Sequence, residues 1–313
     1  MTASPTRALV AILGVLALAA VLAGCGLGAG PAPTAVQLLV TRDFGARVLS
    51  RDHAPNVHGE ETVMSLLMRN DPVSTRYGGG FVQSISGLSG GQESGQPVDW
   101  FYYVNGVQAT KGAAATDVHP GDHIWWDRHD WSQAEDVPAV VGSFPEPFLN
   151  GLGGKRWPVR IECATVTGYA CATVTSRLRA LGVPAAIAAV GSSGEPETLR
   201  LMVGPWNRIG GDLTAHTIAA GPRASGVYAR FSATGKTLAL LAEDGSQVRT
   251  LGRDAGLIAA TRNGESAPLW VVTGTDLAGV DLAAHYFQQG ILQDHFAVAL
   301  AGAQAIPLPD TGP

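Results

Sequence analysis

Between residues 96 and 130, aromatic and aliphatic residues form two runs that turn residues separate. The first run, Trp100–Val104, ends at Asn105-Gly106, a pair that supplies the two positive φ angles of a type I′ turn. The second run follows Pro120-Gly121 and carries Trp125 and Trp126. Side chains alternate along a strand, so the pattern predicts aromatic strands with large rings on both faces of a sheet.

The chain before these strands follows a different period. Val63, Leu66 and Leu67 recur at helical spacing, and Asp71-Pro72 ends the run. A strand pair, one helix and several further strands are the order of a β-grasp, in which the helix packs across the sheet. We expect this domain at residues 35–133, with strands at Val36–Thr41, Arg47–Arg51 and Phe81–Ser86 and a helix at Glu61–Asn70.

The remainder contains a linker and an internal repeat. Residues 134–157 are rich in proline and glycine and also carry the apolar run VVGSFPEPF, which is expected to lie against a domain surface. Asp212–His216 reappears as Asp281–His285, and each unit can be divided into βαββαβ, the order of a ferredoxin-like module. We therefore predict an α+β protein with repeats at 158–234 and 235–313, the second with a short first helix at Gln247–Leu251.

Composition, charge and the N-terminal segment limit the expected partners and cellular location of the protein. A net charge of −5 offers no polybasic surface, so nucleic acid is not an expected partner. Arg7, an apolar run at residues 8–23 and a Leu22-Ala23-Gly24-Cys25 ending predict a secretory signal over residues 1–25, and this ending resembles a bacterial lipobox. That resemblance implies a lipid on Cys25, a tether over 26–34 and a place on the extracytoplasmic face of the cell membrane. The alternative is an uncleaved membrane anchor, for which the apolar run is short.

Two further cysteines remain after Cys25. Cys163 and Cys171 are an even pair in an oxidising compartment, which predicts one disulfide; two buried free thiols are the alternative. His119, His123, Asp127 and His129 suggest a metal site at first sight. On an extended strand, however, His123 and Asp127 lie about 13 Å apart at ~3.3 Å per residue, so no metal is expected.

The motif series resembles a known family. Gly59–Val63, Gly80–Gly87, the strand and turn at Trp100–Gly106 and the later Pro120-Gly121-Asp122 together are similar to the transcobalamin C-terminal-like domain, also called DUF4430, over about residues 35–131. The resemblance implies a β-grasp fold and a small ligand, since cobalamin-binding relatives cover one face of the corrin ring with this domain. This chain lacks their helical partner domain. The ligand-binding candidates are Trp100, Tyr102, Tyr103, Asn105, Trp125 and Trp126, with core packing as the alternative for at least half of them.

The catalytic motifs considered do not support an enzyme. The chain has no phosphate loop and no H-E-x-x-H, and Asp212 and Asp281 are explained as helix starts. We therefore expect a lipid-anchored, non-catalytic protein without a cofactor, which captures a small, corrinoid-like ligand and can pass it to an uptake transporter. The alternatives are a cell-envelope scaffold that binds protein or glycan, and an unrecognised hydrolase.

Overall fold

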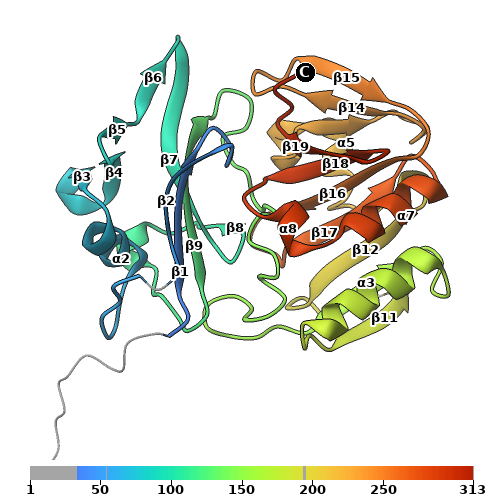
Figure 1. Ribbon diagram of the computed structural model, residues 1–313, viewed down its shortest axis with the longest axis horizontal. Helices are drawn as coiled ribbons and strands as arrows, with labels where there is room; N and C mark the ends of the chain where they lie inside the picture. The colour runs from blue at the N-terminus through green and yellow to red at the C-terminus, as the bar shows by residue number, and fades with distance from the viewer. Residues whose placement is uncertain (1–33, 54, 193–194, 313) are drawn as a thin grey trace, which may run out of the picture.

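The computed structural model describes residues 34–312 apart from 54 and 193–194. The predicted signal peptide, Cys25 and all but the last residue of the predicted tether lie outside the described residues. No helix among the described residues is long and apolar enough to cross a membrane. The protein is a mixed α+β structure, as predicted, and its two halves lie side by side (Figure 1).

A six-stranded sheet forms the first half. Its order is β2-β1-β9-β7-β6, with β8 paired to β7. Strand β1 pairs antiparallel with β2 and parallel with β9, which in turn pairs antiparallel with β7. Asn105 and Gly106 both have positive φ angles between β7 and β8, which confirms the predicted turn. The strands are β1 (Gln37–Arg42), β2 (Arg47–Asp52), β6 (Gly91–Glu93), β7 (Gln96–Val104), β8 (Val107–Gln108) and β9 (His123–Asp130).

One face of this sheet is covered by a helix and a small three-stranded sheet. The helix α2 begins after Thr62, whose side chain accepts a hydrogen bond from the Ser65 amide in a capping box. Its buried residues include Val63, Leu66 and Leu67, the three predicted from their spacing. The elements are α2 (Val63–Asn70), β3 (Val73–Arg76), η1 (Tyr77–Gly79), β4 (Phe81–Ile85), β5 (Leu88–Ser89) and η2 (Ala113–Ala115).

A seven-stranded sheet forms the second half, in the order β11-β10-β12-β17-β16-β18-β19. The first four strands are parallel and the last three antiparallel to their neighbours. Helices α3 and α7 pack together on one face (Figure 1). The elements are β10 (Val159–Cys163), α3 (Tyr169–Ala180), β11 (Ala185–Ala189), β12 (Leu199–Pro205), β16 (Ala255–Thr261), β17 (Leu269–Gly274), α7 (Leu277–Tyr286), α8 (Gln289–Leu292), β18 (Ala297–Ala301) and β19 (Gln304–Leu308).

This topology differs from two separate ferredoxin-like repeats. Strands from both predicted repeats join one sheet, through the parallel pairing of β12 with β17, while β13, β14 and β15 form a sheet of their own. The three helices between β12 and β13 have only four residues each, too short to cover a separate sheet. These elements are α4 (Trp206–Ile209), α5 (Thr217–Ala220), α6 (Pro222–Ser225), β13 (Ala229–Phe231), β14 (Leu238–Leu241) and β15 (Gln247–Leu251).

The helix predicted at Gln247–Leu251 is wrong, because these residues form strand β15. Val248 and Thr250 are β-branched, and glycines at 245 and 252 bound the segment on both sides. This composition favours a short strand between turns. Antiparallel pairing with β14 supplies its backbone hydrogen bonds.

The segment predicted as a linker is itself part of the interior. Val137, Val140, Val141, Phe144 and Phe148 are buried, and they contribute to two different hydrophobic clusters. One cluster combines rings from the first half with apolar residues of β16 and β18 from the second. The second face of the first sheet is therefore closed by the rest of the chain.

The predicted disulfide is confirmed. Cys163 ends β10 and Cys171 lies in the first turns of α3, and their sulfur atoms are bonded. The bond closes the short connection between β10 and α3, beside the edge strand β11 of the large sheet.

Replacing both Cys163 and Cys171 by serine is expected to lower the free energy of unfolding by about 2–3 kcal/mol, because the short loop gains freedom in the unfolded chain. Urea unfolding of the wild type and the double variant measures the difference. Wild-type protein should also gain two daltons on reduction. An unchanged unfolding midpoint in the double variant would contradict the expectation.

Candidate functional site

The six candidates predicted from the aromatic pattern lie in the interior, with exposed fractions between 0% and 8%. Trp100, Tyr102 and Trp126 face α2, whereas Tyr103 and Trp125 face the second half of the chain. Tyr102 and Trp126 stack on each other, with ring centroids 4.9 Å apart. A flat ligand needs a free ring face, and the structure uses these faces for packing on both sides of the sheet.

Asn105, the sixth candidate, connects three segments of the fold through its side-chain amide. Its Oδ1 accepts a hydrogen bond from the His123 amide at 2.8 Å, and its Nδ2 donates to Asp122 Oδ1 and to the Gly151 carbonyl, each at 2.8 Å. The amide thus ties the β7–β8 turn to the start of β9 and to the segment that enters the second half. Its polar atoms are occupied by the protein itself.

The residues considered for a metal have separate partners. His123 contacts Ser143, whereas His129 Nδ1 lies 2.8 Å from Asp127 Oδ1. Across the described part of the chain, no group of three or more histidine, cysteine, aspartate or glutamate residues is placed to hold a metal.

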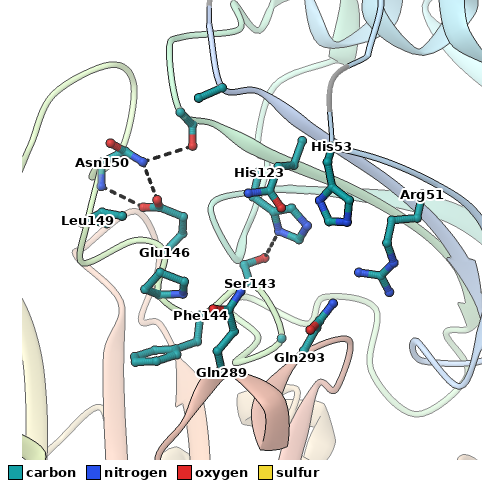
Figure 2. Close-up of a pocket in the computed structure, with 15 residues that line it drawn as sticks. Arg51, His53, His123, Ser143, Phe144, Glu146, Leu149, Asn150, Gln289 and Gln293 are labelled. Carbon is teal, nitrogen blue, oxygen red and sulfur yellow. Dashed lines mark hydrogen bonds between the residues drawn. The ribbon is translucent and has the colours of Figure 1, made fainter. Parts of the chain in front are cut away.

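A cavity of about 480 Å³ opens where the two halves meet. The ends of β1, β2 and β9, the segment from 142 to 150 and helix α8 surround it (Figure 2). We call it the junction cavity. Its polar lining residues are Gln37, Arg51, His53, His123, Ser143, Glu146, Asn150, Gln289 and Gln293.

His123 forms the inner wall of the junction cavity. Its Nδ1 lies 2.8 Å from Ser143 Oγ (Figure 2). Its backbone amide donates to Asn105 Oδ1. Burial is the main cause that lowers the pKa of His123 to about 4, and the nearby Arg51 and His53 side chains act in the same direction. The ring is therefore neutral at neutral pH and can share a hydrogen bond with Ser143 in either direction.

Glu146 lies on the opposite side of the junction cavity. Its carboxyl group accepts hydrogen bonds from the Asn150 backbone amide at 2.8 Å and from Asn150 Nδ2, which also donates to the Gly121 carbonyl (Figure 2). Burial is the main cause that raises the pKa of Glu146 to about 7; the hydrogen bonds from Asn150 oppose the rise and the nearby Asp122 contributes to it. Near neutral pH this group can therefore act as a donor or as an acceptor.

The remaining wall carries one cation and two amides. Arg51 of β2 forms an ion pair with Asp294, which lies just after α8 and so joins the two halves. Gln289 and Gln293 extend from the α8 region toward the same space, and Figure 2 shows His53 between His123 and Arg51. The lining of the junction cavity offers many hydrogen-bond donors and acceptors and has a low net charge. Such a lining suits a polar ligand better than a flat apolar one.

Glu146 gives the folded protein a pH dependence. Its folded pKa of about 7 lies above the ordinary value of 4.5, so its contribution to stability is complete below pH 4.5 and is lost as the pH rises through 7. We expect a loss of about 3 kcal/mol relative to Glu146→Gln over this range, since one pKa unit corresponds to about 1.4 kcal/mol. Urea unfolding at pH 4.5 and pH 7.5 measures this loss for both proteins.

The control is Glu195→Gln, because Glu195 is exposed on the surface. This variant should follow the wild type at both pH values. Parallel pH profiles for the wild type and Glu146→Gln would show that Glu146 does not titrate in this range.

Sequence reasoning missed most of the junction cavity. Ser143, Glu146 and Asn150 lie within the predicted linker, and His123 was considered only as a metal ligand. The unusually apolar run VVGSFPEPF was the available signal, because a free tether would not need it. Gln289 and Gln293 carry no signal in the sequence.

Comparison with known families matches part of the chain. The model of a domain of unknown function, DUF4430, matches residues 60–130, from the start of α2 to the end of β9. No curated protein and no solved structure matches the chain. Of the residues that line the junction cavity, only Gly121 and His123 lie within the matched range. The cavity is therefore built mainly from the sequence outside this domain.

Proposed function

We propose that this chain is a lipid-anchored, extracytoplasmic binding protein that captures a small polar ligand in the junction cavity without transforming it. The observation that carries the proposal is the cavity itself. Its volume of about 480 Å³ falls within the range of small-molecule sites, and polar side chains from separate segments converge on it. Two of them, His123 and Glu146, have perturbed pKa values, which is typical of functional sites.

The strand arrangement supports a β-grasp interpretation of residues 35–133. A parallel pair of first and last strands, β1 and β9, lies between antiparallel neighbours, and α2 packs on one face. In this proposal the second half of the chain takes the place of the helical domain used by transcobalamin-like binders. The ligand then lies between the two halves.

The burial of the five aromatic candidates argues against a corrinoid held on an aromatic surface as the ligand. We favour a smaller molecule with several hydroxyl, amide or carboxyl groups. Delivery to an uptake transporter, with Cys25 as the lipid attachment point, remains part of the proposal.

Thermal unfolding in the presence of defined ligands tests this function. We expect at least one class among monosaccharides, amino acids, dipeptides and dicarboxylic acids to raise Tm, because binding to the folded state stabilises it. Gln293→Ala should reduce that shift, whereas Gln247→Ala on β15, away from the junction cavity, should leave it unchanged. Cobalamin and cobinamide form a separate arm. A shift with a corrinoid alone, unaffected by Gln293→Ala, would reject the junction cavity as the site.

A second candidate function is glycan binding by an envelope scaffold, and one exposed aromatic pair favours it. Tyr77 is 86% exposed and Phe81 37% exposed, and their rings meet edge to face at 6.3 Å. Exposed rings of this kind can stack on sugar faces. Co-sedimentation with purified bacterial cell walls, lost in Tyr77→Ala, would support this function over ligand capture.

A further inference from the structure

Strand β11 forms an open edge of the large sheet. It pairs with β10 on one side and is the terminal strand in the sheet order. Its central residue, Ile187, is 46% exposed although it is aliphatic. Figure 1 shows β11 at the outer border of the molecule, beside α3 and away from the junction of the two halves.

Other edge strands of the protein carry features that discourage pairing with another chain. Strand β2 carries Arg47, Arg51 and Asp52, and β19, at the opposite edge of the large sheet, contains Pro307. Charges and prolines of this kind are common protection against edge-to-edge association. Strand β11 reads Ala-Ala-Ile-Ala-Ala and has neither.

The backbone direction along β11 follows from one hydrogen bond. The Val190 amide donates to the Cys163 carbonyl at 3.3 Å, so residue 190 points its backbone groups toward β10. These groups alternate along a strand, and the amides of Ala185, Ile187 and Ala189 and the carbonyls of Ala185 and Ile187 therefore point outward. The Ala189 carbonyl accepts hydrogen bonds from the Ser192 amide and hydroxyl within the chain. Ile187 thus has both an outward donor and an outward acceptor at the centre of the open edge.

We propose that this edge binds a second copy of the same chain, with the two β11 strands antiparallel about a twofold axis at Ile187. This axis places Ile187 opposite Ile187 and Ala185 opposite Ala189. Because the sequence Ala185–Ala189 reads the same in both directions, each residue meets a residue of its own type. The two Ile187 residues exchange a pair of hydrogen bonds. Each Ala189 amide donates to the opposite Ala185 carbonyl, which adds two more.

The side chains fit the same arrangement. Ile187 shares a sheet face with Ala185, which packs against the cluster beneath α3. The paired isoleucines therefore cover each other on that face, as β-branched cross-strand pairs commonly do. The alanines are small, and β11 brings no like charges together.

Cysteine cross-linking tests the register directly. In the full chain carrying Cys25→Ser, Ile187→Cys is expected to form a disulfide-linked dimer under mild oxidation, since residues opposed in such a pair have Cα atoms about 5.5 Å apart. Ala185→Cys and Ala189→Cys should cross-link when mixed with each other. Ala305→Cys on the opposite edge is the matched control and should remain monomeric. A monomeric Ile187→Cys, or equal cross-linking of Ala305→Cys, would overturn the proposal.

A second measurement separates pairing from random collision. Ile187→Pro removes an outward amide and spares the hydrogen bonds to β10, whereas Ile187→Val keeps the amide. Sedimentation equilibrium should show dimer affinity about ten-fold or more weaker for Ile187→Pro and nearly unchanged for Ile187→Val. Circular dichroism checks that both variants fold. Equal affinities in two folded variants would reject pairing through β11.

Discussion

Asp127→Ala is expected to lower the free energy of unfolding by about 3–5 kcal/mol, because it removes a buried charge that several groups share. Asp127 is fully buried. Its carboxylate accepts hydrogen bonds from Thr41 Oγ1 and from the amides of Phe44 at 3.1 Å and Gly45 at 2.9 Å, and it contacts His129. The substitution leaves the amides of Phe44 and Gly45 without this acceptor in the buried site, and Thr41 Oγ1 keeps only the Trp126 carbonyl, at 3.4 Å, as an acceptor.

The backbone between β1 and β2 depends on the same carboxylate. Asp43, Phe44 and Gly45 all have positive φ angles, which only glycine adopts without cost. Asp127 holds this turn from the neighbouring strand. Guanidinium unfolding at pH 7 measures the loss, with Asp130→Ala as the control on the same strand. Asp130 accepts one hydrogen bond, from Ser132, so about 1 kcal/mol is expected there. Similar losses for the two variants would contradict the role given to Asp127.

Phe296→Ala is the second substitution with a large expected effect. Phe296, the residue before β18, is buried, and its ring meets those of Phe44, Tyr103, Trp125 and His129 at centroid distances of 5.2–5.6 Å. All four belong to the first half. Truncation leaves a void between the halves, and buried phenylalanines typically lose about 3–5 kcal/mol on replacement by alanine.

Calorimetry and guanidinium unfolding measure this effect together. The wild type is expected to unfold in a single transition, since both halves share one hydrophobic cluster. Phe81→Ala is the matched control, because Phe81 is partly exposed on β4, and it should lose about 1 kcal/mol or less. Two separate wild-type transitions, or a loss at Phe296 no larger than at Phe81, would show that the halves are stable independently.

Local patterns predicted the elements that depend on local chemistry. Val63, Leu66 and Leu67 indicated α2, and Asn105-Gly106 indicated the turn after β7, because spacing and backbone preference are properties of neighbouring residues. The disulfide between Cys163 and Cys171 followed from cysteine number and compartment. Each of these features involves residues close together in the sequence.

Long-range arrangement was not predictable in the same way. Nothing local in β12 indicates that it pairs with β17, almost seventy residues later, instead of closing its own repeat. The aromatic strands suggested rings on both faces but not what covers the second face. The junction cavity forms only when the segment that carries Glu146 folds against the sheet that carries His123. The sequence of neither segment alone indicates that the two residues line one cavity.

The burial of segment 134–157 makes the two halves of the chain depend on each other. Because it fills space between the halves, a cut there would bare the Tyr103 and Trp125 face on one fragment and the Phe296 surface on the other. Each fragment would then tend to aggregate. The two halves of this chain are therefore expected to stay soluble only together. Lineages that carry this arrangement are expected to inherit both halves together, with paired changes on either side of the shared interface.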